Sequence, residues 1–436
     1  MQNVKGTYDF FGNEQAIRRK VETTLRTLFE SYDFDEMNST ILNELELLAS
    51  KYAGGDEILK EMYQLTDQGQ RKLGLRYDLT IPFAKVIALN PGIELPYKRY
   101  EIGKVFRDGP VKKGRLREFL QCDADVVGIA GPQAEAELMQ LAAEAFRRLE
   151  IPVVIRWNNR KLLGETLESL GVPAESRSSV MLTLDKLDKI GREGVLRELA
   201  GKELSASAAE SIVRLTEAPV GNFEAWVTAC GIANGDGANE ARALAKLLER
   251  LGLHSVCRFD PFLARGLSFY TGTVYEIFDA SGRFTSSLGG GGRYDNIIGQ
   301  LVERPDIAYP TVGLSFGMES IMAMLAERPA TLPQPSVLVV PIGEDMLAPA
   351  LETAALLRAD GIRTAVEPIG RKLKKSLASA SVRGIRWVVL IGENEAAARQ
   401  VQLKDMTEKS EQRLTPAQAL DWVKGAAAPN GEDTSR

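Results

Sequence analysis

The chain has 436 residues, 44% of them hydrophobic and 26% charged, and a formal net charge of −5. Length and composition are typical of a globular protein of about three domains, and no apolar run reaches the ~18 residues of a membrane span. Three scattered cysteines and one histidine exclude a disulfide framework, a zinc-finger pattern and a His-rich metal site. We therefore expect a cytoplasmic protein with no metal ligands of its own and no membrane contact.

The N-terminal third contains helices and strands in mixed order. Apolar side chains at helical spacing predict an amphipathic helix over residues 14–32. Residues 62–78 predict a strand, a turn and a strand. A helix follows, with Thr80 as its expected N-cap and Pro82 in its first turn. Asp78 and Thr80 are therefore expected where a strand meets a helix N-terminus.

The central part predicts an antiparallel sheet with an inserted helical region. Extended segments at 98–107 and 115–128 flank a turn-rich loop, and residues 133–149 predict a helix. Residues 160–250 are rich in Leu, Ala, Glu and Arg and predict a helical insertion. Extended character returns after residue 266, and residues 311–325 predict a strand and then a helix. The order does not match alternating βαβ units.

The last hundred residues have a different period. Residues 327–335 hold three prolines and predict a linker. Apolar strands and helices then alternate over residues 336–425, which predicts a small α/β domain with a largely parallel sheet. The tail, 426–436, is expected to be disordered. The predicted division is a domain over 1–326, this linker, a second domain and the tail.

A basic hairpin that ends in carboxylates is the first candidate site. In a strand, alternate side chains share a face, so one side carries Arg117, Phe119, Gln121, Asp123 and Asp125, and the other, mostly apolar side faces the core. Arg107 on the preceding strand can lie across from them. Carboxylates would bind an ammonium group and arginines would bind phosphate oxygens. The alternative is a solvated hairpin with cross-strand charge pairs.

Three further stretches each allow two interpretations. In RGLSFYTGTVYE, Arg265 could point into a site beside an aromatic ring, or the segment could be an ordinary strand entry. The glycines of LGGGGRYD could let the backbone pass close to a bulky group, or form a flexible hairpin loop. A basic helix could be a solvated face or could touch a polyanion; its charges are Arg371, Lys372, Lys374 and Lys375.

Taken in this order and spacing, the stretches RYDLTIPFAK, FRDGPVKKGRLREFLQCDAD, RGLSFYTGTVYE and GGGRYD resemble the signatures of the histidyl-tRNA synthetases, which are class II aminoacyl-tRNA synthetases. The resemblance extends over residues 1 to about 425. It implies an α+β fold: an antiparallel catalytic sheet with a helical insertion, followed by an α/β anticodon-binding domain. It also implies a homodimer that uses L-histidine, ATP, Mg²⁺ and tRNA(His).

The resemblance also implies roles for individual residues. Asp78, Thr80 and Gln121 would hold the α-ammonium of histidine, and Asp125, Phe269 and Tyr270 would lie near its imidazole. Arg107 would bind the α-phosphate, and Arg265 would offset the charge that develops there. The residues near ATP and the tRNA acceptor end would be Lys112, Arg115 and Arg117.

The sequence departs from the family pattern at one position that bears on the chemistry. The family's third motif ends in an arginine, whereas GLSFGMESI carries Ser320 there. The alternative function is therefore a histidine sensor that charges no tRNA, of the kind seen in the regulatory subunit of ATP phosphoribosyltransferase. That regulator typically lacks a C-terminal domain like residues 336–425.

Overall fold

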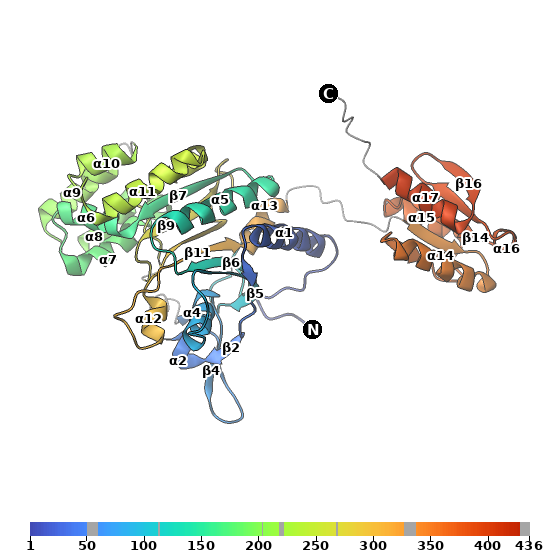
Figure 1. Cartoon of the computed structure of the whole chain (residues 1–436), viewed down its shortest axis with the longest axis horizontal. Helices are drawn as coiled ribbons and strands as arrows, with labels where there is room; N and C mark the ends of the chain where they lie inside the picture. Colours follow the sequence, from blue (N-terminus) through green and yellow to red (C-terminus); the bar gives the residue numbers. More distant parts are fainter. Residues whose placement is uncertain are drawn as a thin grey trace. The chain divides into compact units, whose positions relative to one another are not determined.

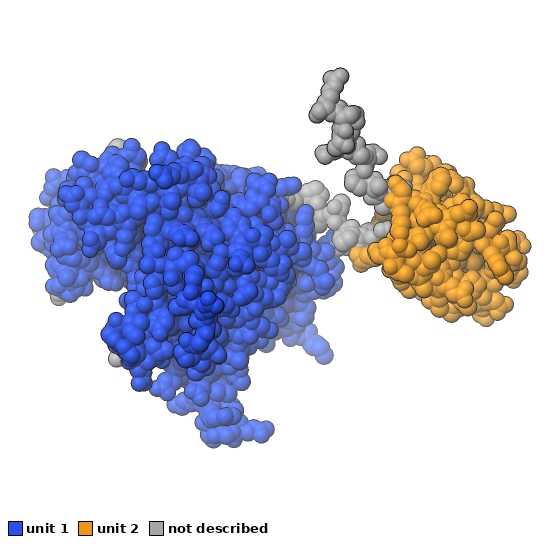
Figure 2. Space-filling view, in the orientation of Figure 1, with its two compact units in different colours: residues 1–330 blue, residues 331–436 orange. Residues whose placement is uncertain are grey.

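The computed structural model describes residues 1–49, 60–111, 114–202, 204–217, 222–266, 269–326 and 337–427. The chain divides into two compact units, Met1–Ala330 and Thr331–Arg436 (Figure 1, Figure 2). Lys112, the expected linker at 327–335 and residues 428–436 of the expected tail lie outside the described residues. Among the described helices, none combines the length and apolar character needed to cross a bilayer.

The described part of the first unit is built on an eight-stranded sheet of order β1-β5-β6-β11-β10-β9-β7-β8. All neighbouring pairs are antiparallel except β1–β5 and β7–β8. The strands are β1 (Asp35–Glu36), β5 (Tyr97–Phe106), β6 (Glu118–Val127), β7 (Val153–Asn159), β8 (Cys257–Phe259), β9 (Thr273–Asp279), β10 (Gly289–Arg293) and β11 (Thr311–Gly317). The antiparallel sheet expected from the sequence is confirmed.

One face of this sheet carries the main hydrophobic core. The amphipathic helix expected at 14–32 is α1 (Gly12–Ser31), and it packs on that face with α5 (Gln133–Arg148) and α13 (Met318–Leu325) (Figure 1). Alternate apolar residues of several strands enter this core, such as Cys122 and Ala124 of β6 and Val312 and Leu314 of β11. The other face is therefore left for polar groups.

A small second sheet and α4 lie beside the end of the hairpin. The sheet has the order β2-β4-β3, with β2 (Leu42–Glu44), β3 (Gln64–Thr66) and β4 (Lys72–Leu75). Helix α4 (Thr80–Leu89) begins one residue earlier than expected, so Thr80 is its first residue and not its N-cap. The Asp78 carboxylate accepts the hydrogen bond from the Ile81 N–H instead, at 3.1 Å. Its short acidic side chain satisfies an amide that the helix leaves unpaired.

The glycine run forms a strand, so its interpretation as a flexible hairpin loop is wrong. β10 pairs with β9 on one side and β11 on the other, which places it inside the sheet. Two flanking ladders hold the backbone of the run in place although glycine itself has little strand propensity. Tertiary pairing here outweighs local preference.

The expected helical insertion connects β7 to β8 and is drawn in green in Figure 1. Its helices are α6 (Arg160–Ser169), α7 (Ala174–Leu184), α8 (Leu187–Ala200), α9 (Ala206–Glu217), α10 (Phe223–Ala229) and α11 (Asp236–Arg250). Shorter helical segments of this unit are α2 (Leu45–Leu48), the 3-10 turn Leu253–Ser255 and α12 (Ile297–Leu301).

The second unit is an α/β domain whose described strands have the order β13-β12-β14-β15-β16. They are β12 (Val337–Pro341), β13 (Thr364–Val366), β14 (Trp387–Ile391), β15 (Val401–Asp405) and β16 (Ser410–Leu414). The first three are parallel as expected, but β15 and β16 add an antiparallel edge that the sequence did not suggest. The helical segments are Glu344–Met346, α14 (Leu347–Ala359), α15 (Leu373–Val382), α16 (Glu393–Ala397) and α17 (Pro416–Ala427).

Candidate active site

The polar face of the larger sheet carries a row of charged side chains aligned by strand register. Asp125 of β6 lies opposite Arg99 of β5 and Gly313 of β11. Two residues earlier, Asp123 lies opposite Glu101 and Ser315. Directly opposed residues share a face, so these groups gather on the side away from the core. Asp123 and Asp125 are both buried, which rules out the solvated hairpin.

Asp125 is fixed by two buried partners. The Arg99 guanidinium lies 2.7 Å from its carboxylate, and the Tyr294 hydroxyl donates to Oδ1 at 2.5 Å. Burial raises the pKa of Asp125, while Arg99 and Tyr294 oppose that shift. Arg99 also donates to the Leu79 carbonyl at 3.0 Å, so it ties this strand to the turn that carries Asp78 and Thr80.

Gln121 and Asp123 form the next part of the row. The Gln121 amide donates to the Ser315 hydroxyl at 3.1 Å and to both Asp123 oxygens at 3.3 Å. The buried Gln121 carbonyl oxygen finds no hydrogen-bond donor among the described residues. Burial, with a further contribution from Asp125, raises the pKa of Asp123 to about 7. At this end of the row, the Gln121 carbonyl oxygen is therefore available to accept a hydrogen bond from a ligand.

Asp78 belongs to the same acidic set, although it comes from the N-terminus of α4. Burial raises its pKa to about 6, and the Ile81 amide and Arg107 oppose the shift. The charge of Asp125 adds to the rise, and Asp78 in turn raises the pKa of Asp123. The three carboxylates therefore repel one another across a shared space, which favours a cationic ligand between them.

Arg107 follows β5 and reaches over β6. Its Nε donates to the Tyr77 carbonyl at 3.0 Å, and its guanidinium lies 5.2 Å from the ring centroid of Phe119. Phe119 is two residues from Gln121 and so shares its face of the strand. Burial lowers the pKa of Arg107, and Asp78 is the strongest group opposing that shift. The arginine stands beside the acidic row.

Arg265 lies over the glycine strand β10. Its Nη1 donates to the Tyr275 carbonyl at 3.0 Å, and its guanidinium is 5.8 Å from the centroid of Tyr270. A Cβ on Gly290 would lie 1.8 Å from Nη1. Gly290 is opposite Ser315, which is opposite Asp123. Arg265 is thus placed on the same face as the carboxylates.

The glycines of β10 and β11 form a floor without side chains under this site. A Cβ on Gly292 would come within 2.9 Å of the Tyr270 ring, and one on Gly313 within 2.0 Å of Asp125 Oδ1. The glycine run therefore lets side chains lie flat on the sheet. Phe269 packs on Tyr270 with ring centroids 4.7 Å apart and on Tyr294 at 5.8 Å, which builds an aromatic wall near Asp125.

Two of the remaining basic residues predicted here, Arg115 and Arg117, are described by the structure, and both have acidic partners. Arg115 Nη2 donates to both carboxylate oxygens of Glu61, each at 2.5 Å, and Arg117 pairs with Asp108 at 3.0 Å. The same loop contains Gly114, where a Cβ would lie 3.5 Å from the Ser320 hydroxyl. Ser320 is buried, so the loop of the basic hairpin packs against the position where the family carries its arginine.

Sequence reasoning assigned no role to Arg99 or Tyr294 and placed Asp123 in the row without a function. The pairing of β5 with β6 contains the missing signal, because counting back from the hairpin turn puts Arg99 opposite Asp125. Tyr294 follows the glycine run directly, and its contact with Asp125 spans 169 residues. No local pattern could reveal that contact.

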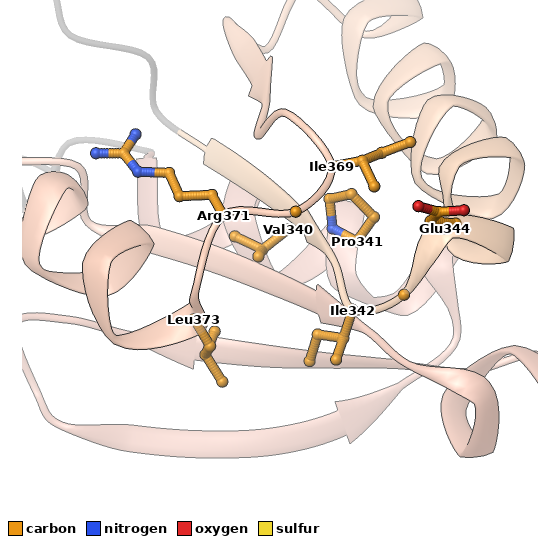
Figure 3. Close-up of a pocket in the computed structure, with 9 residues that line it drawn as sticks. Val340, Pro341, Ile342, Glu344, Ile369, Arg371 and Leu373 are labelled. Atoms are coloured by element: carbon orange, nitrogen blue, oxygen red, sulfur yellow. The ribbon is translucent and has the colours of Figure 1, made fainter.

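The second unit has a pocket at the carboxyl end of its parallel strands, where open α/β sheets commonly bind ligands (Figure 3). Arg371 and the apolar Ile342 and Ile369 line it and are exposed. In Figure 3 the Arg371 side chain extends away from the Glu344 carboxylate. The full lining is Val340, Pro341, Ile342, Gly343, Glu344, Ile369, Gly370, Arg371 and Leu373.

Comparison with known proteins places both units in one family. The sequence model of the histidyl-tRNA synthetases matches residues 6–321, and that of the anticodon binding domain matches residues 336–426. Histidine–tRNA ligase 1 of Bacillus cereus is 46% identical over 419 residues, which cover 95% of each chain. Histidine–tRNA ligase 2 of Shouchella clausii is 44% identical and covers 95% of this chain and 98% of its own.

The fold agrees with this assignment. The crystal structure of histidyl-tRNA synthetase from Nostoc sp. PCC 7120 superimposes with a TM-score of 0.83 at 27% identity, covering 98% of this chain and 99% of the other. The expected α+β architecture with a separate C-terminal domain is confirmed. By sequence and by fold, this chain belongs to the histidyl-tRNA synthetase family.

Proposed function

We propose that this chain joins L-histidine to ATP as histidyl-adenylate, releases pyrophosphate, and transfers the histidyl group to the 3′ end of tRNA(His) with release of AMP. One observation supports this most strongly. Asp123 and Asp125 lie on the same sheet face as Arg265, and Asp78 and Arg107 lie next to this acidic group, so carboxylates that would hold a cation are close to two arginines that would hold phosphate. An amino acid and a nucleotide phosphate are the substrates that this charge distribution suits.

Histidine would bind at the acidic end. Its α-ammonium group would be held by Asp78, Thr80 and Gln121, whose buried carbonyl oxygen needs a donor. Its imidazole would lie near Asp125 and the ring of Tyr270, with Phe269 behind. A ring with N–H donors suits a carboxylate that Arg99 already holds in one orientation.

ATP would bind along the arginines. Adenylate formation is an in-line attack of the histidine carboxylate on the α-phosphorus, so it needs positioning and charge stabilisation and no covalent nucleophile. Arg107 would hold the α-phosphate, and Arg265 would offset the charge that develops on it. Among the described residues no group of three metal-ligating side chains is suitably placed, so Mg²⁺ would enter with the phosphates it coordinates.

The tRNA would contact both units. We propose residues 1–326 as the catalytic domain, with the insertion at about 160–250, and residues 336–425 as the anticodon-binding domain. The acceptor end would meet Lys112, Arg115 and Arg117, and the anticodon stem would meet the exposed basic start of α15. A polyanion would replace the acidic partners of Arg115 and Arg117 by phosphates.

We further propose a homodimer that works in the cytoplasm, where ATP and tRNA are found. Tyr8, Phe11 and Leu42 are exposed in the N-terminal part of the chain and could pack against a second copy. Three free cysteines suit a reducing compartment. Sedimentation of the purified chain would show a species of twice the monomer mass; a monomer at micromolar concentration would contradict the dimer.

The histidine-sensor alternative is weaker. The chain contains the C-terminal domain that such regulators typically lack. It also has Arg265, whose guanidinium lies over the polar face of the sheet. A sensor that only binds histidine and catalyses no reaction would not need this arginine. We therefore keep the synthetase as the proposed function.

The decisive experiment is ATP–pyrophosphate exchange by the purified chain with each amino acid in turn, followed by charging of tRNA(His) with labelled histidine. We expect exchange with histidine and with no other amino acid, and charging that depends on ATP. Histidine binding without exchange at saturating ATP would identify a sensor. Exchange without charging would indicate that another carrier receives the histidyl group.

A further inference from the structure

We propose that Asp185, which belongs to the helical insertion, is a positioning residue for Arg265. This inference rests on the proposed function, because Arg265 is assigned there to the α-phosphate. The backbone of Arg265 has φ +54°, in the left-handed region that residues other than glycine rarely adopt. A non-glycine residue stays there only when its surroundings hold it.

Asp185 provides that hold. It follows the last turn of α7, and its Oδ1 accepts hydrogen bonds from the backbone N–H of Ala264 and of Arg265, each at 2.9 Å. These two N–H groups belong to consecutive peptide units, so one carboxylate oxygen fixes the chain on both sides of Ala264. Hydrogen bonds to an ionised acceptor are roughly twice as strong as neutral ones.

The same segment is also held by the eight-stranded sheet. The fully buried Asn158 of β7 donates through Nδ2 to the Pro261 carbonyl at 3.0 Å and to the Leu263 carbonyl at 2.9 Å. Carbonyls of the segment are thus bound by the sheet and amides by the insertion. The left-handed turn at Arg265 lies at the end of this doubly bound stretch.

The side chain depends on that turn. From a left-handed backbone, the guanidinium reaches across Gly290 to the Tyr275 carbonyl and the Tyr270 ring. Without Asp185, two amides lose their acceptor and the backbone can relax to a common φ, which would move the guanidinium away from the acidic row. The insertion would thereby control the geometry of the reacting phosphate without touching it.

The test is steady-state ATP–pyrophosphate exchange by the full chain with Asp185→Ala and Asp185→Asn. Asn keeps the accepting Oδ1, whereas Ala removes it. We expect Asp185→Ala to lower kcat by about 10–100-fold, as for a 1 Å misplacement of a catalytic group, and to leave the KM for histidine within about twofold. Asp185→Asn should recover most of kcat. The matched control is Asp188→Asn in the first turn of α8, because Asp188 pairs with Arg156 at the surface and its loss should leave kcat unchanged.

Hydrogen–deuterium exchange of residues 262–266 gives a readout that does not depend on turnover. We expect protection of the Ala264 and Arg265 amides in the wild type and in Asp185→Asn, and its loss in Asp185→Ala. Should Asp185→Ala fail to fold, Asp185→Ser, whose hydroxyl is too short to reach, takes its place. Wild-type kcat in a folded variant without the acceptor, or an equal loss for Asn and Ala, would overturn the inference. Absence of histidine-dependent ATP–pyrophosphate exchange in the wild type would instead refute the proposed function.

Discussion

In the protein without ligand, ionisation of three carboxylates lowers the stability of the folded state; they belong to Asp78, Asp123 and Asp125. Burial raises the pKa of each carboxyl, and Arg99 pairs directly with Asp125 alone among the three. A buried carboxylate without a compensating cation destabilises the folded state. This energy would be recovered if an ammonium group bound there, as proposed for histidine, and the site would then trade stability for affinity.

This trade predicts the effect of Asp123→Asn on stability. The folded-state pKa of Asp123 is about 7, above the ordinary aspartate value of 3.8. The carboxyl is protonated in both states below about pH 4, so it costs nothing there; the cost grows as pH rises through this window and is complete above about pH 7. Asp123→Asn should therefore raise the free energy of unfolding at pH 8 by on the order of 2–4 kcal/mol.

Urea unfolding of the full chain, followed through the first unit, at about pH 5.5 and pH 8 checks this sign. The gain from Asp123→Asn should be larger at pH 8, and histidine affinity should fall. A variant that is less stable than wild type at pH 8 would show that Asp123 is already compensated in the free protein.

Arg99 predicts the opposite kind of change. It is fully buried, pairs with Asp125 and packs on Phe83 with 4.5 Å to the ring centroid. Arg99→Met keeps much of the volume and leaves the Asp125 charge unpaired, which should lower the unfolding free energy by about 3–5 kcal/mol. Adding Asp125→Asn to this variant should restore part of the loss; no recovery in the double variant would contradict the pairing.

At the scale of elements, the glycine run of β10 is explained by the side chains of Arg265 and Tyr270, which lie against the strand. Gly290 and Gly292 face Arg265 and Tyr270 at distances that no Cβ allows. Gly290→Ala would place a methyl group 1.8 Å from the original position of Arg265 Nη1 and 2.6 Å from the Tyr275 carbonyl. The side chain must move or the ladder must shift.

We expect Gly290→Ala to lower kcat of histidine-dependent pyrophosphate exchange by at least about 100-fold, because it would displace the Arg265 guanidinium that we propose acts on the transition state. Gly92→Ala is the control: a Cβ there meets nothing within 4 Å and the residue is exposed. Full activity in Gly290→Ala would mean that the guanidinium works from another position.

Local sequence patterns predicted the helices and strands whose own apolar residues show a clear period. The apolar period of α1 and the buried run of β14 are visible in sequence because each packs one face or both on a core. β10 was ambiguous because glycine carries no strand signal, and β16 was missed because its residues are mostly polar and show little period. β15 was overlooked, although Val401 and Leu403 alternate with Gln402 and Lys404 as in a strand with one buried face. The acidic row followed from alternation along β6, but Arg99, Tyr294 and Asp185 act through contacts between distant segments.

At the scale of the whole molecule, the two units would divide the reaction. The first would hold the groups proposed for adenylate formation, and the second carries exposed basic residues at the start of α15, next to its pocket. Substitutions in the second unit should thus affect the tRNA and leave histidine activation intact. The two half-reactions can be measured separately on the full chain.

Charge reversal at Lys374 or Lys375 tests this division. Each variant to Glu should raise the KM for tRNA by about tenfold, since one lost phosphate contact is worth roughly 1–2 kcal/mol with added repulsion, and should reduce the salt dependence of tRNA binding. Pyrophosphate exchange should stay at the wild-type rate. Lys409→Glu is the control, because the turn from β15 to β16 lies at the opposite edge of the sheet. Equal effects from all three would show that only net charge matters.

The most direct test of the account compares histidine binding and histidine activation in Arg265→Ala. If the acidic row holds the amino acid and Arg265 acts on the phosphate, calorimetry should give a dissociation constant for histidine within about threefold of wild type, while exchange falls by about 10³-fold or more. Loss of binding and activation together, or exchange that persists without the guanidinium, would contradict it.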